Sequence, residues 1–327
     1  MTELKKRLKG GSLSATSLIV DGKNQFVRKE VSISENREYG FQRWYSQLKK
    51  MQRYEVQFPG IFPKILKFGY LKDMAYFDME YFENFPTAQE FLISTKDKKQ
   101  IEKFTKLLIK TMQKMHKINI VSNPEAIDLY LHEEVNKRLS DCYSNKSFSN
   151  FIKYKNLYFN GELIPSFLSQ IDKFYSLFNN YINPSETFTH GNLTLENILY
   201  SPEKNKIVFI DPYEENIIDS KLAEYSQIYQ SCNSKYEIYN SYNPKVINNY
   251  VSINIPEYDG LNYFNEIFTN YVRKECDDKQ FLIIKLLEIS QFIRMLPFKM
   301  AVDENKMILF YSLASKLFND LQTNGCK

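Results

Sequence analysis

Residues 189–200 read Thr-His-Gly-Asn-Leu-Thr-Leu-Glu-Asn-Ile-Leu-Tyr, and residues 207–212 read Ile-Val-Phe-Ile-Asp-Pro. Each stretch contains a short apolar run of the kind that forms a buried strand, and polar residues stand beside both runs. Asp211 ends the second run, where a strand would deliver its carboxylate to a position suited to a magnesium ion. The alternative is an ordinary turn or helix-capping aspartate before Pro212. The two stretches therefore predict a pair of strands with a candidate functional carboxylate.

The spacing of these polar residues resembles that of one superfamily. Aminoglycoside phosphotransferases and choline kinases, which share a kinase-like fold, carry His-Gly-Asp, four further residues, Asn, and then a short hairpin ending in an apolar run and Asp. His190, Asn197 and Asp211 match this pattern. The resemblance implies that Asn197 and Asp211 bind Mg²⁺, and that His190 supports the catalytic loop by hydrogen bonding. A direct acid or base role of His190 is the alternative.

One position departs from the pattern, because Asn192 stands where the superfamily has its catalytic aspartate. An amide oxygen can still orient the acceptor hydroxyl, but it cannot take the proton, and a general base typically contributes about 10² to 10⁴-fold in rate. Phosphoryl transfer should therefore suffer more than binding. Three explanations stay open: the asparagine was introduced to trap a complex, it marks a natural pseudokinase, or another group serves as base.

The resemblance also implies a nucleotide-binding lysine in the first part of the chain. Strand alternation turns Lys29 toward one face of the sheet and Arg28 toward the other. In the superfamily the face that carries Lys29 covers the nucleotide, so Lys29 is the predicted phosphate-binding and catalytic lysine, with a solvated strand lysine as the alternative. Glu38 is the predicted ion-pair partner of Lys29. Glu30 and Glu35 compete for that role, as does a simple favourable charge near a helix N-terminus.

Two further segments are expected to contact the nucleotide. Residues 10–16 resemble a phosphate-covering loop, in which backbone N–H groups and the hydroxyls of Ser12 and Ser14 would meet phosphate oxygens. The sequence around Glu80 and Phe82 resembles the hinge between the lobes of the superfamily. Backbone groups of these two residues would then read the adenine edge.

Charged residues near the motif are candidates for binding the acceptor. Glu196 and Glu214, together with Glu215 and Asp219, could recognise an amine or sugar hydroxyls, with solvated loop charges as the alternative. Arg294 could bind an acidic or phosphorylated acceptor, or it could simply complement a helix C-terminus.

The composition supports a globular protein and excludes several classes. A hydrophobic content of 43% with 25% charge in 327 residues is enough for two lobes with real cores. The formal charge of +4 is spread along the chain, which does not favour nucleic acid. The four cysteines lack metal-ligand spacing and are predicted to be reduced thiols. Without a signal peptide or a sufficiently long apolar run, the chain is predicted to be cytoplasmic and to lack a membrane span.

Periodicity divides the chain into two predicted lobes. A hairpin around Asp21-Gly22, a helix from about Glu35 to Met51 and two short strands fill the first part. Helical spacing dominates afterwards, beginning with a stripe along residues 101–115. We therefore predict an α+β, protein-kinase-like fold with a β-rich nucleotide-binding lobe, residues 1–81, and a helical catalytic and acceptor-binding lobe, residues 82–327.

The sequence thus predicts an ATP-dependent, Mg²⁺-requiring phosphotransferase that acts on a hydroxyl of a small metabolite, of sugar or amino-alcohol type. Related bacterial chains place surface-polysaccharide metabolism among the candidate contexts. Because of Asn192, activity of this chain is expected to be impaired. The alternative is a nucleotide-binding pseudokinase that acts as a regulatory or interaction module, and a third hypothesis treats the motif as a coincidence.

Overall fold

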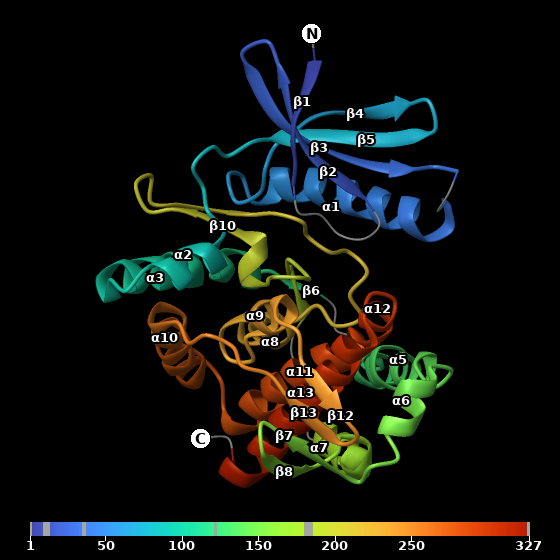
Figure 1. Cartoon of the computed structure of the whole chain (residues 1–327). Coiled ribbons are helices and arrows are strands. Elements are labelled where there is room, and N and C mark those ends of the chain that lie inside the picture. The colour runs from blue at the N-terminus through green and yellow to red at the C-terminus, as the bar shows by residue number, and fades with distance from the viewer. Residues whose placement is uncertain (1, 9–13, 35–36, 121–122, 180–185, 326–327) are drawn as a thin grey trace. The chain divides into compact units, whose positions relative to one another are not determined.

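The computed structural model describes residues 2–8, 14–34, 37–120, 123–179 and 186–325, and Figure 1 shows the whole chain. The chain forms two compact units that interleave in sequence. The first unit contains residues 1–91, 106–115 and 190–216, and the second contains the remaining residues. The lobe boundary expected between residues 81 and 82 stays a prediction.

A five-stranded antiparallel sheet forms the first unit together with one long helix and a hairpin (Figure 1). Its strands, in spatial order, are β1 (Thr2–Arg7), β2 (Ala15–Asp21), β3 (Asn24–Ser32), β5 (Met74–Glu80) and β4 (Ile65–Leu71). The helical elements are η1 (Arg37–Phe41), α1 (Gln42–Gln57) and η4 (Leu195–Asn197), and the hairpin is β10 (Ile198–Ser201) with β11 (Lys206–Phe209). Helices α2 (Ala88–Ser94) and α3 (Lys98–His116) contribute residues to both units.

One face of the sheet and one face of α1 build the core of the first unit. Alternate residues of β3 are buried, and α1 buries Trp44, Leu48 and Met51 at the spacing of successive helical turns. The Trp44 ring lies 5.6 Å from that of Phe77 on β5, and its indole N–H donates to the backbone oxygen of Lys29 at 3.3 Å. This packing holds β3 in place above α1.

Main-chain hydrogen bonds tie the motif hairpin to other segments of the first unit. The Phe209 N–H donates to the backbone oxygen of Ile61 at 2.8 Å, and the Tyr200 N–H donates to that of Pro86 at 2.9 Å.

The hairpin predicted at Asp21-Gly22 is confirmed by the pairing of β2 with β3. The end predicted for the first helix is wrong, because α1 continues six residues past Met51 to Gln57. Tyr54 is buried in that extension, so tertiary packing lengthens the helix.

The second unit is mostly helical, as expected for this part of the chain. Its helices are α4 (Ala126–Tyr130), η2 (Leu131–Asn136), α5 (Lys137–Asp141), α6 (Lys146–Phe151), η3 (Leu168–Gln170), α7 (Ile171–Phe178), α8 (Lys221–Cys232), α9 (Tyr236–Ser241), α10 (Asp259–Glu275), α11 (Asp278–Arg294), α12 (Leu296–Met300) and α13 (Glu304–Asn324). Helices α8 and α11 are buried over most of their length. Among the described residues, no helix combines the length and apolar character needed to cross a bilayer.

A small sheet in the second unit was not predicted. It joins β12 (Lys245–Ile247), β13 (Tyr250–Ser252), β7 (Asn156–Phe159) and β8 (Glu162–Pro165) in that order, while β6 (Asn119–Ile120) pairs with β9 (Glu186–Thr187) (Figure 1). Strand β13 runs parallel to β7, so residues about ninety positions apart are neighbours. Strands of three or four residues are too short to show a period in the sequence.

The cysteines provide a test of this packing. Cys142, Cys232 and Cys276 are free and buried, whereas Cys326 lies outside the described residues. Burial raises the pKa of the Cys142 thiol to about 12 and that of Cys276 to about 11. In a Cys326→Ser variant at pH 8, we expect a thiol reagent to label the unfolded chain fully and the native chain at least about a hundredfold more slowly. Rapid native labelling would contradict the packing described.

Candidate functional site

The loop before the hairpin requires glycine at position 191. Gly191 has a φ of +87°, and a Cβ atom there would lie only 2.3 Å from the backbone oxygen of Tyr213 and 2.1 Å from Asn216 Nδ2. The chain after Asp211 therefore passes directly against this loop. The Tyr213 N–H donates to the backbone oxygen of His190 at 2.9 Å and fastens the two segments together.

His190 links both sides of this loop through its imidazole. The ring is fully buried; Nε2 donates to the backbone oxygen of Ile210 at 2.7 Å, and Nδ1 accepts from the Asn192 N–H at 3.2 Å. Stacking on Phe62 and an edge contact with Phe209 fix the ring plane. Because the main chain engages both ring nitrogens, neither is placed to take a proton from an acceptor.

Asn192 and Asn197 are connected within the same loop. The Asn192 backbone oxygen accepts from Asn197 Nδ2 at 2.8 Å, while the Asn192 side chain is exposed. The Ile210 N–H donates to the backbone oxygen of Asn197 at 2.9 Å, which extends the register of the hairpin by one pair. Asn197 and Asp211 therefore lie at the same end of the hairpin.

Lys29 on β3 reaches Asp211 across the first unit. Its Nζ lies 2.9 Å from Asp211 Oδ1, and only 6% of Lys29 is exposed. Burial disfavours a charged Asp211, but attraction to the Lys29 ammonium and the hydrogen bond from it prevail and hold the pKa of Asp211 below its usual value. The Asp211 carboxyl is thus ionised at neutral pH.

The neighbouring arginine lies on the opposite face of β3. Arg28 forms two hydrogen bonds with Asp78 on β5, at 2.7 and 2.8 Å, and its guanidinium lies over the Tyr76 ring. This bidentate pair gives Arg28 a structural partner of its own. The alternation predicted for residues 28 and 29 is confirmed by these contacts.

The donor set suits a magnesium ion that is shared with phosphates. Asp211 offers a carboxylate, and Asn197 offers an amide oxygen because its Nδ2 atom is turned toward the loop. Mg²⁺ prefers such hard oxygen ligands and usually takes one or two from protein and the rest from phosphates and water. In the described part of the chain, no cluster of three or more His, Cys, Asp or Glu residues forms an all-protein metal site.

The other predicted nucleotide contacts are only partly described. Ser12 lies outside the described residues, as does the side chain of Glu38, whereas Ser14 is half-buried just before β2. Glu80 ends β5, and its N–H donates to the backbone oxygen of Lys64 at 3.0 Å. Phe82 follows β5, with the Lys206 ammonium 4.9 Å from its ring centroid.

The predicted acceptor-binding residues are distributed over both units. Glu196 lies in the turn η4 and is half-buried, while Glu214 pairs with Arg53 at 3.1 Å and with Lys50 at 3.5 Å. The sequence analysis did not predict that Lys50 and Arg53 pair with Glu214. Lys50 sits between the apolar residues of α1, and only this interruption of the buried stripe could have drawn attention to it.

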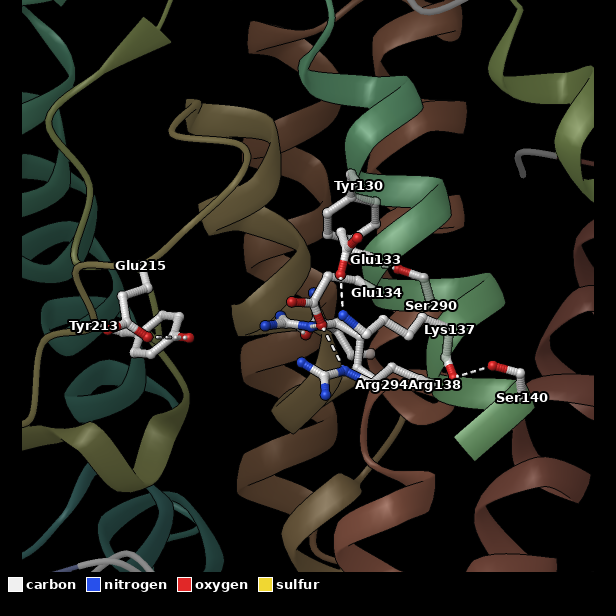
Figure 2. Close-up of polar contacts among 11 residues, drawn as sticks. Tyr130, Glu133, Glu134, Lys137, Arg138, Ser140, Tyr213, Glu215, Ser290 and Arg294 are labelled. Atoms are coloured by element: carbon white, nitrogen blue, oxygen red, sulfur yellow. Dashed lines mark hydrogen bonds and ion pairs between the residues drawn. The ribbon is translucent and has the colours of Figure 1, made fainter. Parts of the chain in front are cut away.

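Arg294 lies in the second unit, within the cluster drawn in Figure 2. Its Nε donates to Glu134 Oε2 at 2.8 Å, and its Nη1 donates to Gln291 Oε1 at the same distance. Arg138 also contacts Glu134, at 3.4 Å. Burial opposes the charge on Glu134, but the two guanidinium groups outweigh it and lower the pKa of this carboxyl. The positive charge of Arg294 is thus already balanced by the Glu134 carboxylate.

Comparison with known proteins identifies the fold. The chain matches no family model and no curated protein. It is similar to the crystal structure of aminoglycoside phosphotransferase APH(4)-Ia, with a TM-score of 0.59, 9% identity, and coverage of 97% of this chain and 93% of that one. It also resembles spectinomycin phosphotransferase APH(9)-Ia in complex with ADP and spectinomycin, at a TM-score of 0.47, 11% identity, and coverage of 96% and 88%. The first likeness confirms the α+β, kinase-like fold class.

Proposed function

We propose that the chain is a phosphotransferase of small molecules, with ATP as donor, Mg²⁺ as metal ion and a hydroxyl group as acceptor. The observation that carries this proposal is the Lys29–Asp211 ion pair. It joins residues 182 positions apart and sets a buried ammonium beside the candidate metal ligand. A lysine and a metal-binding carboxylate are what electrostatic clamping of a triphosphate needs.

Each residue of the site has a role in this proposal. Lys29 binds phosphate oxygens, Asp211 and Asn197 hold the metal ion, and His190 keeps the loop in shape. When bound, Mg²⁺ neutralises negative charge on the phosphates. Asn192 orients the acceptor hydroxyl through its amide oxygen but cannot take its proton. Phosphoryl transfer by this chain is therefore impaired more than its binding of nucleotide and acceptor.

The proposed acceptor class draws on the fold and on the exposed end of the loop. The likeness to an aminoglycoside phosphotransferase supports a small polyhydroxylated acceptor, of sugar or amino-alcohol type. Glu196, next to Asn197, remains a candidate contact for an amine or a hydroxyl of that acceptor. Surface-polysaccharide metabolism is the context we favour over antibiotic modification.

A second function is favoured by Asn192 alone. The chain would then be a pseudokinase that binds nucleotide and regulates or recruits another protein. The two functions share the nucleotide site and differ in whether restoring a carboxylate at position 192 creates turnover.

Nucleotide binding is therefore the first test of the proposal. We expect Mg²⁺-ATP to raise the melting temperature, since a ligand at one hundred times its Kd stabilises a protein by about 2.7 kcal/mol. Lys29→Met should weaken ATP binding in calorimetry by about ten- to a hundredfold, because a charge-assisted contact is lost.

Lys23→Met is the matched control, since Lys23 is exposed in the turn between β2 and β3. It should leave ATP affinity unchanged. If neither ATP nor GTP shifts the melting temperature, with or without Mg²⁺, the enzyme and the pseudokinase proposals both fail.

A further inference from the structure

Helix α1 contacts the segment that follows Asp211. Side chains on successive turns of the helix reach residues 212–214. Gln47 Nε2 donates to the backbone oxygen of Pro212 at 3.0 Å, and Lys50 Nζ donates to that of Tyr213 at 2.5 Å. The carbonyl groups of two consecutive residues after Asp211 are thus held by one helix.

Two arginines on the same helix extend this contact. The Arg43 guanidinium lies 4.8 Å from the centre of the Tyr213 ring, and Arg53 pairs with Glu214 at 3.1 Å. Glu214 is therefore engaged with α1, which favours a structural role for this carboxylate over contact with an acceptor.

Lys50 is the buried member of this set. Only 1% of the residue is exposed, whereas the Arg53 side chain is 45% exposed. A buried ammonium is unfavourable unless it is hydrogen-bonded and paired. Lys50 meets both conditions through the Tyr213 carbonyl and Glu214 Oε2 at 3.5 Å, and it also lies 5.2 Å from the centre of the Tyr54 ring. Its charge is therefore directed at the segment after Asp211.

The backbone of Asp211 has an uncommon conformation that these contacts support. Its φ of +55° lies in the left-handed region, which few non-glycine residues adopt and in which Asp and Asn are enriched. The ring of Pro212 fixes the φ of the residue next to Asp211, and the Tyr213 N–H donates to the backbone oxygen of His190. Lys50 binds the backbone oxygen of Tyr213, so this residue is held at both its N–H and its carbonyl group and the direction of the chain leaving Asp211 is defined.

We propose that Lys50 is a positioning residue for Asp211: by holding Tyr213 and Glu214, it keeps the Asp211 carboxylate turned toward Lys29 and toward a bound metal ion. The metal ion in this inference rests on the proposed function, whereas the contacts of Lys50 with Tyr213 and Glu214 do not. The position of Asp211 then depends on helix α1 through the contacts of Lys50. Loss of Lys50 should affect the metal-dependent part of nucleotide binding more than nucleotide binding as such.

The test compares Lys50→Met with Lys49→Met and Lys50→Arg. Methionine keeps most of the length of the side chain beside Met51 and Tyr54 but removes the charge, whereas Lys49 is exposed on the same helix. ATP affinity is measured by calorimetry with Mg²⁺ and with a chelator. Lys50→Met should reduce the Mg²⁺-dependent gain in affinity by about tenfold and leave the chelator value within about twofold. Lys49→Met should change neither, and Lys50→Arg should restore part of the gain.

Hydrogen exchange separates this inference from the proposed function. In the nucleotide-free protein, peptides that cover residues 206–216 should exchange about tenfold faster in Lys50→Met than in Lys49→Met, while those of β3 stay unchanged. Unchanged exchange in this segment overturns the inference whether or not ATP binds. An unaltered Mg²⁺-dependent gain overturns it as well. If Lys50→Met does not fold, Glu214→Gln and Gln47→Leu are expected to give the same two changes with smaller amplitude.

Discussion

Replacing Asn192 with aspartate is expected to raise ADP formation by about 10² to 10⁴-fold in the presence of Mg²⁺-ATP and a suitable acceptor. The substitution exchanges an amide for a carboxylate of the same size, so that the acceptor hydroxyl gains a group that takes its proton. The surroundings tolerate the change because the Asn192 side chain is exposed. The hydrogen bonds that shape the loop involve the backbone of Asn192, and they are kept.

The measurement is ADP release with pooled sugars, amino alcohols and aminoglycosides. The unaltered chain is assayed beside the variant, and Asn205→Asp, in the exposed turn between β10 and β11, is the matched control. Turnover by Asn192→Asp alone would show that the chain is an enzyme whose activity is limited by residue 192. Assays with the pooled compounds tested separately would then identify its acceptor class. Silence of all three proteins, despite Mg²⁺-ATP binding, would favour the pseudokinase function.

Asp211→Asn in the Asn192→Asp background is expected to lower the restored rate by about a thousandfold, since a metal-binding carboxylate stabilises the transition state by several kcal/mol. Asparagine is chosen over alanine because it adopts the left-handed backbone conformation with little cost, and Asp211 has a φ of +55°. The pKa of Asp211 is held below its usual value, mainly by Lys29 against the effect of burial. The carboxylate is therefore ionised throughout the neutral range. The amide of the variant does not ionise, so raising the pH cannot restore the missing charge.

The rate is measured over a series of Mg²⁺ concentrations, with Asp73→Asn as control. Asp73 is exposed in the turn between β4 and β5, and its substitution should leave the rate unchanged. For Asp211→Asn, the concentration of Mg²⁺ that gives half of the maximal rate should rise as well. A variant that retains both the rate and the Mg²⁺ dependence would remove Asp211 from the metal site.

Short-range patterns predicted the parts of the site that are continuous in the chain. The strands β10 and β11 appear as apolar runs, and the residues on either side of them lie where the hairpin ends. The opposite facing of Arg28 and Lys29 follows from the period of two in a strand. These features depend on residues within about twenty positions of one another, over which backbone geometry alone relates one side chain to the next.

Long-range contacts could not be predicted in this way. Lys50 lies in a helix whose apolar stripe indicates burial, and a lysine within that stripe has no local explanation. Its partner, the Tyr213 carbonyl, is 163 residues away and is a backbone group that every residue carries. The short parallel pairing of β13 with β7 is of the same kind, because neither strand is long enough to show its period.

The sequence by itself therefore determined the fold class, the hairpin that presents Asn197 and Asp211, and the departure at Asn192. Only the tertiary structure decided that Lys29 meets Asp211 and that α1 holds the segment after it through Lys50. The reason is physical: periodicity encodes which face of an element is buried, whereas the partner of a buried charge is set by packing between elements distant in the chain.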